Sequence, residues 1–208
     1  MSERSPQRDA LRLLYILVEG STPLPEPDDS GAVAIFRGES RLFAFDFWVR
    51  NPDYLADELL SLFEKDGDVS HLETAKLIFA AEEPEIRRYP MLRYRFGAYE
   101  RLDNALSILR SRNLILIPVK RAGTKVLETD FLIMPEAVSL AEDIVKQFPE
   151  LAWYRTRTKV VAALAGGRGG AALKKQQHDQ IEYHAATLGS TIPSIAGRVK
   201  ERLNGLTP

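Results

Sequence analysis

The sequence predicts a mainly α-helical fold with a small β-wing, an α+β class in which helices precede and follow a winged-helix-like domain. Apolar residues recur at helical spacing along most of the chain. Between residues 87 and 134 the pattern changes from helix to strand, basic turn, strand and helix again. A glycine-rich break follows. We therefore expect three parts: 1–83, helical and acidic; 84–165, winged-helix-like and basic; and 166–208, a glycine-hinged helical segment.

The N-terminal part is expected to form a series of helices. The first covers residues 7–19, and a proline-rich loop over 21–31 follows it. Residues 41–50 are apolar almost all round, which fits either a buried strand or a buried helix. We favour the helix, because the next helix opens directly afterwards at Pro52 and proline suits a first helical position. A last helix is expected over 71–81.

The order of a winged helix is predicted in the middle of the chain. A helix over 99–111 has its leucines on one face, and a hydrophobic strand over 114–119 follows it at once. A polar, basic turn over 120–124 connects this strand to a return strand over 125–133. The next helix opens at Pro135, with an acidic residue in its first turn.

The C-terminal segment begins at the glycine-rich run 166–170. A helix over 151–165 precedes the run, and two more helices are expected over 171–186 and 194–203. The run loosely matches a dinucleotide-binding loop, but it follows a helix rather than a strand and lacks an acidic residue about 20 positions onward. We therefore interpret it as a flexible hinge, and the segment beyond it as one that lies on another surface of the protein.

Composition excludes several classes of protein. The chain has 208 residues, 45% of them apolar, and no cysteine, which rules out disulfides and thiolate metal sites. The N-terminus is too charged for a signal peptide. The longest apolar runs fall far below the roughly 20 residues that a membrane-spanning helix needs. We expect a cytoplasmic protein that does not enter the membrane.

The net charge of −1 conceals an asymmetry between the two halves of the chain. Residues 1–83 hold 8 Lys and Arg against 17 Asp and Glu, a balance of −9, whereas residues 84–208 hold 20 against 12, a balance of +8. The basic half can face phosphate. An equally good explanation is that the two halves attract each other or share a surface.

A basic, aromatic-rich segment opens the winged-helix-like domain. Arginine interleaved with tyrosine suits phosphate contact and base stacking, and the same mixture is enriched at protein–protein interfaces. A third explanation of these arginines is that they form ion pairs with the acidic half of the same chain. The acids Glu100 and Asp103 on the expected recognition helix argue against sequence-specific readout. We expect the following residues to bind DNA or a partner: Arg87, Arg88, Arg93, Tyr94, Arg95, Arg101, Arg110, Arg112, Lys120, Arg121 and Lys125.

The sequence offers little support for catalysis. It contains neither a Gly-x-Ser-x-Gly nor a His-Glu-x-x-His motif. His178 and His184 are six residues apart, which on a helix places them on different faces and disfavours a shared metal. We expect a protein that is not an enzyme and has no cofactor, catalytic residue or metal ligand.

Three motifs resemble a family of bacterial defence proteins. They are Leu42 with Asp46-Phe47-Trp48-Val49-Arg50-Asn51-Pro52-Asp53-Tyr54-Leu55, then Met91-Leu92-Arg93-Tyr94-Arg95-Phe96-Gly97-Ala98-Tyr99, then Phe148-Pro149-Glu150-Leu151 with Arg155 and Arg157. Over roughly residues 8–180, the chain looks like the small middle component of three-component systems built around an ABC-type, SMC-like ATPase, as in the Lamassu group.

This resemblance implies a non-enzymatic adaptor in an anti-phage or anti-plasmid complex. The adaptor would link the SMC-like ATPase to an effector subunit, often a nuclease, and would help to grip DNA. The alternative is a free-standing, dimeric winged-helix regulator of transcription. A regulator should bind a defined duplex by itself, whereas an adaptor should bind DNA tightly only together with its partners.

Overall fold

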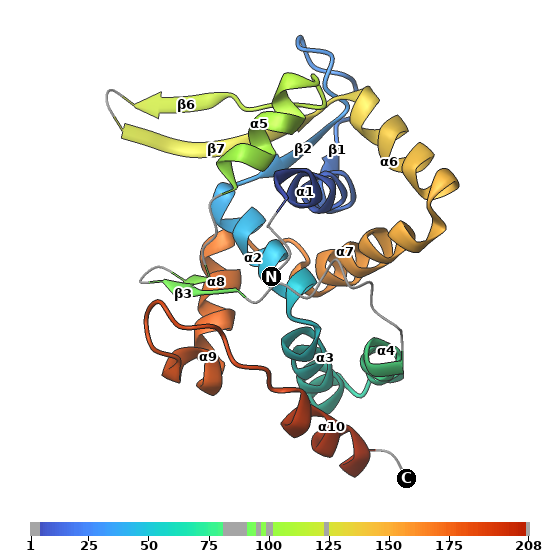
Figure 1. The fold of residues 1–208 in the computed structure, drawn as a ribbon, viewed down its shortest axis with the longest axis vertical. Coiled ribbons are helices and arrows are strands. Elements are labelled where there is room, and N and C mark those ends of the chain that lie inside the picture. Colours follow the sequence, from blue (N-terminus) through green and yellow to red (C-terminus); the bar gives the residue numbers. More distant parts are fainter. Residues whose placement is uncertain (1–4, 81–90, 95–96, 99–101, 123–124, 207–208) are drawn as a thin grey trace. The chain divides into compact units, whose positions relative to one another are not determined.

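The computed structural model describes residues 5–80, 91–94, 97–98, 102–122 and 125–206 (Figure 1). The chain forms two compact units. Unit 1 comprises Met1–Asp46 and Glu100–Gln176, and unit 2 comprises Phe47–Tyr99 and Gln177–Pro208. Each unit is thus built from two separate stretches of sequence, and the expected divisions after residues 83 and 165 do not coincide with the boundaries of the units.

Unit 1 contains an antiparallel sheet with the strand order β1–β2–β7–β5, in which β6 also pairs with β7. The register of β2 on β7 runs from Ala34 opposite Ile133 to Arg37 opposite Asp130. The sequence analysis assigned no strand to residues 34–37, so the sheet is larger than the predicted wing. The strands are β1 (Thr22–Pro23), β2 (Ala34–Arg37), β5 (Ile115–Leu116), β6 (Val119–Ala122) and β7 (Lys125–Ile133).

Helices surround this sheet, and α1 lies in the middle of unit 1. It packs against α5, α6, α7 and the strands β2 and β7, and Figure 1 shows it between α5 and α7. Unit 1 also contains the first part of α2 and the first part of α8. The bounds are α1 (Pro6–Gly20), α2 (Glu39–Arg50), α5 (Asp103–Ser111), α6 (Pro135–Gln147), the 3₁₀ turn η2 (Pro149–Leu151), α7 (Ala152–Ala165) and α8 (Gly170–Asp179).

The order of the elements in unit 1 is that of a winged helix. The helix α1 is followed by β2, α2, α5, β5 with β6, and finally β7, which lies between β2 and β5 in the sheet. Residues 47–99, which belong to unit 2, are therefore inserted in the sequence between the second and third helices of this motif. The expected fold class, mainly helical with a small antiparallel β-structure, is confirmed.

Apolar and aromatic side chains make up the core of unit 1. Leu13, Ile16, Phe36 and Phe131 are completely buried, because the apolar face of α1 is covered on several sides. The ring centroids of Phe36 and Phe45 lie 5.3 Å apart in an edge-on arrangement. This placement explains why residues 41–50 are apolar almost all round: the helix α2 is buried over most of its length, as predicted.

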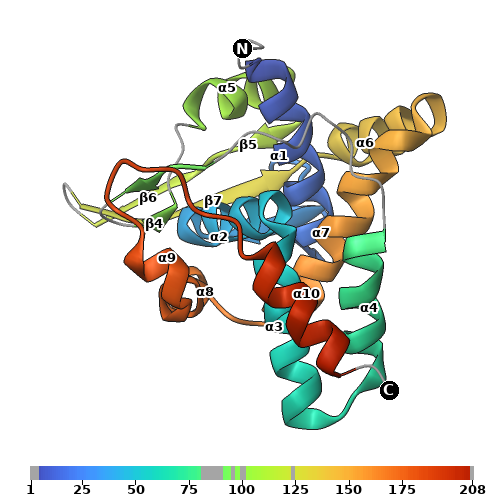
Figure 2. The same cartoon turned by 60° about the horizontal axis from the view of Figure 1, so that its bottom comes forward.

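Unit 2 is mostly helical. The helix α3 (Pro52–Asp66) packs against α4 (Val69–Ala80), and α10 (Ala196–Gly205) packs on both (Figure 2). As the sequence predicts, α3 begins at a proline, and it ends at Gly67, whose φ of 73° is left-handed. The unit also contains the strands β3 (Arg93–Tyr94) and β4 (Gly97–Ala98) and the short helix α9 (Ile181–Ala185).

Two predicted elements are wrong in their extent. The expected helix 171–186 is two helices, α8 and α9, because Gln180 has extended backbone angles of φ −72° and ψ 121°. The expected strand 114–119 is split into β5 and β6 around Pro118, which has no N–H to donate to a neighbouring strand. The strand β6 then continues to Ala122, through most of the predicted turn.

Candidate nucleic-acid and partner interface

The helix α5, third in the winged-helix order, has one buried and one exposed face. Leu102, which precedes it, and Ala105 and Leu109 within it are buried, and the helix packs against α1. These positions confirm most of the predicted inward face of the helix; Leu106, predicted on the same face, is half-buried. Residues 99–101 lie outside the described part of the chain. The exposed positions on α5 are Asp103, Asn104, Ser107, Arg110 and Ser111.

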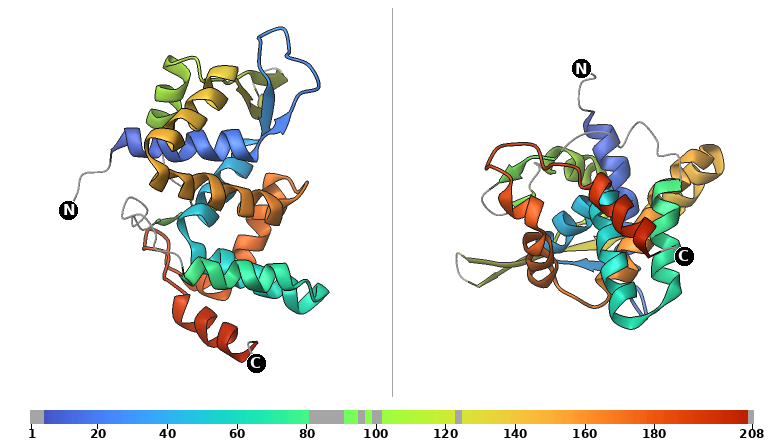
Figure 3. Two further views of the ribbon diagram at one scale, coloured as in Figure 1. Left: turned by 90° about the vertical axis from the view of Figure 1, so that its right-hand side faces the viewer. Right: turned by 90° about the horizontal axis from the view of Figure 1, so that it is seen from below.

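The β6–β7 hairpin extends away from the rest of unit 1 (Figures 1 and 3). Its strands are joined in register from Val119 opposite Thr129 to Ala122 opposite Lys125, with a shift between Lys120 and Arg121. Lys120 and Arg121, predicted at a polar tip, therefore lie within a strand. A register shift of this kind bends and twists a hairpin locally.

The predicted binding residues are divided between the two units. Arg110, in the last turn of α5, and Arg112, directly after it, are exposed. They belong to unit 1, together with the hairpin residues Lys120, Arg121 and Lys125, whereas Arg93 and Tyr94 form the strand β3 of unit 2. Four further predicted residues lie outside the described part of the chain: Arg87, Arg88, Arg95 and Arg101.

Arg93 makes internal contacts. Its guanidinium donates hydrogen bonds to the carbonyl oxygens of His184 and Ala186, and it lies 5.7 Å from the centroid of the Tyr183 ring. Its backbone N–H also donates to the carbonyl of Ser190 at 2.9 Å. Arg93 thus holds the segment after α9 in place, so a charge reversal at this position would disturb unit 2 before it tested any partner surface.

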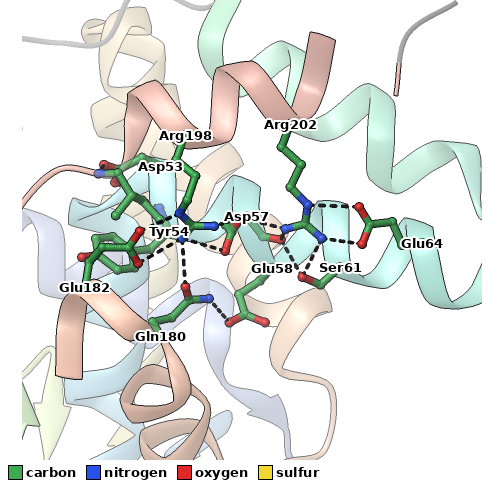
Figure 4. A network of polar contacts seen from close by, with 11 residues as sticks. Asp53, Tyr54, Asp57, Glu58, Ser61, Glu64, Gln180, Glu182, Arg198 and Arg202 are labelled. Carbon is green, nitrogen blue, oxygen red and sulfur yellow. Dashed lines mark hydrogen bonds and ion pairs between the residues drawn. The ribbon is translucent and has the colours of Figure 1, made fainter. Parts of the chain in front are cut away.

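A network of ion pairs in unit 2 was not predicted from the sequence. Two arginines of α10, Arg198 and Arg202, point at the acidic side of α3 (Figure 4). The Nη1 atom of Arg202 lies 2.7 Å from Oδ1 of Asp57, and its Nη2 atom lies 2.7 Å from Oε2 of Glu64. Arg198 lies 3.1 Å from the same Asp57 oxygen, and its Nε atom lies 2.6 Å from Oε1 of Glu182.

Asp53 extends this network to the start of α10. One of its carboxylate oxygens accepts hydrogen bonds from Ser194 Oγ at 2.7 Å and from the backbone N–H of Ile195 at 2.8 Å. Ile195 occupies the N-cap position of α10, so a side chain of α3 binds the amino end of that helix. These contacts favour, within unit 2, the explanation that acidic and basic stretches of the chain attract each other.

Replacing Asp57 with asparagine should lower the free energy of unfolding by about 1–3 kcal/mol, because a buried carboxylate that accepts from two arginines loses its charge. Urea unfolding would measure the loss. The matched control is Glu73→Gln on α4, whose side chain is 58% exposed and pairs with Lys76, three positions along the same helix, at 2.9 Å. The control substitution should lower the free energy of unfolding by less than about 0.5 kcal/mol. Equal losses in both variants would show that the network adds nothing to stability.

The pH dependence of this network follows from Glu64. A hydrogen bond from Arg202 lowers the pKa of Glu64 from its ordinary value of 4.5. Because the pKa of Glu64 is lower in the folded than in the unfolded state, the ionised carboxylate stabilises the fold. This stabilisation is complete above about pH 4.5 and is lost as the pH falls through the lowered pKa. The difference in stability between the natural chain and Glu64→Gln should therefore shrink on acidification.

The rings of two of the three histidines, His71 and His178, contact neighbouring side chains, whereas His184 is exposed. The His178 ring packs edge-on against Tyr183 with centroids 5.2 Å apart, and His71 Nε2 lies 3.4 Å from a carboxylate oxygen of Asp66. Among the described residues, no three acidic or histidine side chains gather in an arrangement that could hold a metal ion.

Of the three motifs that carry the family resemblance, the first lies mostly in the cores of the units, whereas Phe148, Pro149 and Glu150 of the third are exposed. Asp46, Phe47 and Tyr54 are completely buried. Of the later motif, Arg157 is buried with its guanidinium 5.0 Å from the Trp153 ring centroid, and Arg155 Nε lies 2.6 Å from a carboxylate oxygen of Glu19. The buried residues of these motifs, Asp46, Phe47, Tyr54 and Arg157, contribute to packing and do not themselves form a surface that a partner would recognise.

Comparisons with known proteins found no family model, no curated protein and no solved structure that matches this chain. In the described part of the chain, no helix is both long and apolar enough to cross a membrane.

Proposed function

We propose that this protein is a non-enzymatic adaptor that contacts the DNA backbone with unit 1. The observation that supports the proposal is the basic end of the winged helix. Arg110 and Arg112 are exposed at the carboxyl end of α5, and Lys120, Arg121 and Lys125 lie on the hairpin that extends from the same unit. Arginine and lysine on such elements contact phosphate, which positions a protein on DNA without reading its sequence.

The distribution of charge favours weak and non-specific contact. Residues 102–133 contain five basic and three acidic residues, a balance of only +2. Asp103 is exposed at the amino end of α5, where it would repel phosphate, and Lys120 stands opposite Glu128 in the hairpin register. A module of this kind needs further contacts from partners to hold DNA firmly, which agrees with an adaptor.

The family resemblance defines the partners in this proposal. The adaptor would work in the cytoplasm between an SMC-like ABC ATPase and an effector subunit, an anti-phage or anti-plasmid nuclease in the simplest form. The alternative, a free-standing transcriptional regulator, is favoured by one observation. Asn104 and Ser107 are exposed on α5, and both side chains can form hydrogen bonds with base edges.

Purification of the tagged protein under native conditions from its own host distinguishes the adaptor from the free-standing regulator. An adaptor should bring a large coiled-coil ATPase and a third subunit with it, and should bind duplex DNA tightly only in that complex. A homodimer that purifies alone and retains one defined duplex would overturn the adaptor proposal in favour of the regulator.

The variant Arg110→Glu/Arg112→Glu tests the DNA surface. In the purified assembly, it should weaken binding to any duplex by about tenfold or more and reduce the slope of log affinity against log salt by about 1 for each phosphate that the variant no longer neutralises. Fluorescence anisotropy over a series of salt concentrations would measure both. The control Lys146→Glu/Lys159→Glu makes the same change of charge at side chains that are 70% and 62% exposed. Equal affinities of the two variants would contradict the assigned surface.

A further inference from the structure

Unit 1 contains an open cavity of about 600 Å³ that the proposed function does not use. Residues 37–41, at the end of β2 and in the first turn of α2, line one side, and the glycine-rich run 166–170 lines another. Thr22 and Thr129 contribute hydroxyl groups. All lining residues in the described part of the chain are charged, hydroxyl-bearing, glycine or alanine, so the cavity suits a polar ligand.

The side chains that line this cavity are predominantly positive. Arg37, Arg41 and Arg168 stand against a single acidic residue, Glu39. Arg41 is held in place by a hydrogen bond of 3.1 Å to the carbonyl of Gly20, and its guanidinium lies 4.6 Å from the centroid of the Phe45 ring. Arg168 is held by a hydrogen bond of 2.7 Å to Gln176 and by carbonyls at the end of α7.

Of the three arginines that line the cavity, Arg37 is the one most available to bind a ligand. It is exposed at the end of β2, and no carboxylate pairs with it in the part of the chain that the structure describes. Burial lowers the pKa of Arg41, and the nearby positive charge of Arg37 lowers it further. Both arginines line the same cavity, and an anion bound there would offset the repulsion between their like charges.

The backbone around the cavity adds hydrogen-bond donors. A Cβ atom on Gly170 would come within 2.6 Å of the backbone nitrogen of Arg41, so glycine is what allows α8 to begin directly beside the first turn of α2. The N–H of Arg41 already donates to the carbonyl of Gly38 at 3.1 Å, so the donors that the start of α2 can offer are the N–H groups before that of Arg41, which in general have no acceptor within a helix. The hydroxyl of Ser40 lies in the same turn. Arginine, hydroxyl and backbone N–H groups together are the donors that proteins use for phosphate.

We propose that this cavity binds a phosphate group, carried by a mononucleotide or by the backbone of a nucleic acid. Its volume lies within the range of about 300–1,000 Å³ that is usual for small-molecule sites. The sequence analysis interpreted the glycine run as a hinge because no strand precedes it. In the folded unit the run faces residues 37–41, more than a hundred positions earlier, and no linear motif contains that pairing.

Isothermal titration of the purified full-length chain with ATP, inorganic phosphate and a short DNA duplex tests this proposal. Arg37→Ala should weaken binding of the phosphate-bearing probe by about tenfold, as the loss of one charge-assisted contact predicts. Because Arg37 is exposed, the variant should remain folded, which circular dichroism would verify. Lys146→Ala, a change at another exposed cation of unit 1, is the control and should leave binding unchanged.

The three probes distinguish the sources of the phosphate. Binding of ATP that inorganic phosphate competes away and Arg37→Ala weakens supports a mononucleotide site. Binding of the duplex alone, weakened by Arg37→Ala, supports contact with a nucleic-acid backbone. Failure of every probe to bind, or binding that Arg37→Ala leaves unchanged, would overturn the proposal. Since Arg110 and Arg112 are not involved, the result is independent of the DNA surface proposed above.

Discussion

Replacement of Arg12 by methionine is expected to lower the free energy of unfolding by about 3–5 kcal/mol, because it removes one partner of a buried ion pair. The Nε atom of Arg12 lies 2.5 Å from Oδ1 of Asp46, and its Nη1 atom lies 2.7 Å from Oδ1 of Asp9. Asp46 is completely buried and Arg12 is 6% exposed. Burial by itself would lower the pKa of Arg12, but the two carboxylates outweigh it and raise the pKa above its ordinary value.

The size of this effect comes from the charge that remains. In Arg12→Met, the carboxylate of Asp46 stays in the core of unit 1 without the arginine that compensated its transfer from water. The double variant Arg12→Met/Asp46→Leu removes the arginine and the completely buried carboxylate and leaves Asp9, whose side chain is 14% exposed. It should therefore recover most of the loss, because apolar replacement of a buried pair is often neutral or stabilising.

Urea unfolding followed by circular dichroism would measure all of these variants. The control is Arg8→Met on the same helix, where the side chain is exposed, and it should change stability by less than about 0.5 kcal/mol. A loss below about 1 kcal/mol for Arg12→Met would show that the pair contributes little. A double variant as unstable as Arg12→Met would contradict the explanation by the Asp46 charge that stays in the core after the arginine is removed.

Gly170→Ala should destabilise unit 1 by about 1–3 kcal/mol, the usual cost of overpacking. A Cβ atom at this position would lie 2.6 Å from the backbone nitrogen of Arg41, 2.6 Å from Cβ of Ser40 and 2.7 Å from the Ser40 carbonyl carbon. Two of these three atoms belong to the backbone of α2, which cannot move away as the end of a flexible side chain can. The helices α2 and α8 would have to separate at their first turns.

The neighbouring glycine provides a matched control. A Cβ atom on Gly169 would meet nothing within 4 Å, so Gly169→Ala should leave stability within about 0.5 kcal/mol of the natural chain. Thermal unfolding of both variants would measure the difference, and Gly170→Val should enlarge it. If Gly170→Ala proves as stable as Gly169→Ala, the close approach of the two helices does not depend on glycine.

These two glycines also show where inference from the sequence stops. Both stand in one run that is typical of a hinge, and nothing local distinguishes them. Residues 40–41, far away in the sequence, lie against Gly170 and leave no space for a side chain there. At Gly169 the structure has space for one. The same limit applies to Arg93 and Arg110, which the sequence analysis could not tell apart as binding residues. In the folded chain, Arg93 donates hydrogen bonds to backbone carbonyls of unit 2, and Arg110 is exposed.

The sequence by itself determined most of the helices and the long return strand of the hairpin, but not the extent of the hairpin's first strand. Apolar spacing, Pro52, Gly67 and Pro135 place helices close to where they lie, because such signals act within a few residues. Tertiary structure alone decided that β2 joins β7, that the helix beyond Gly170 breaks at Gln180, and that Arg198 and Arg202 meet the acids of α3. The strand pairing and the ion pairs of α10 join residues roughly a hundred or more positions apart, and Gln180 Nε2 donates a hydrogen bond to Glu58, 122 positions earlier. The free energy of such a contact leaves no periodic trace in the local sequence.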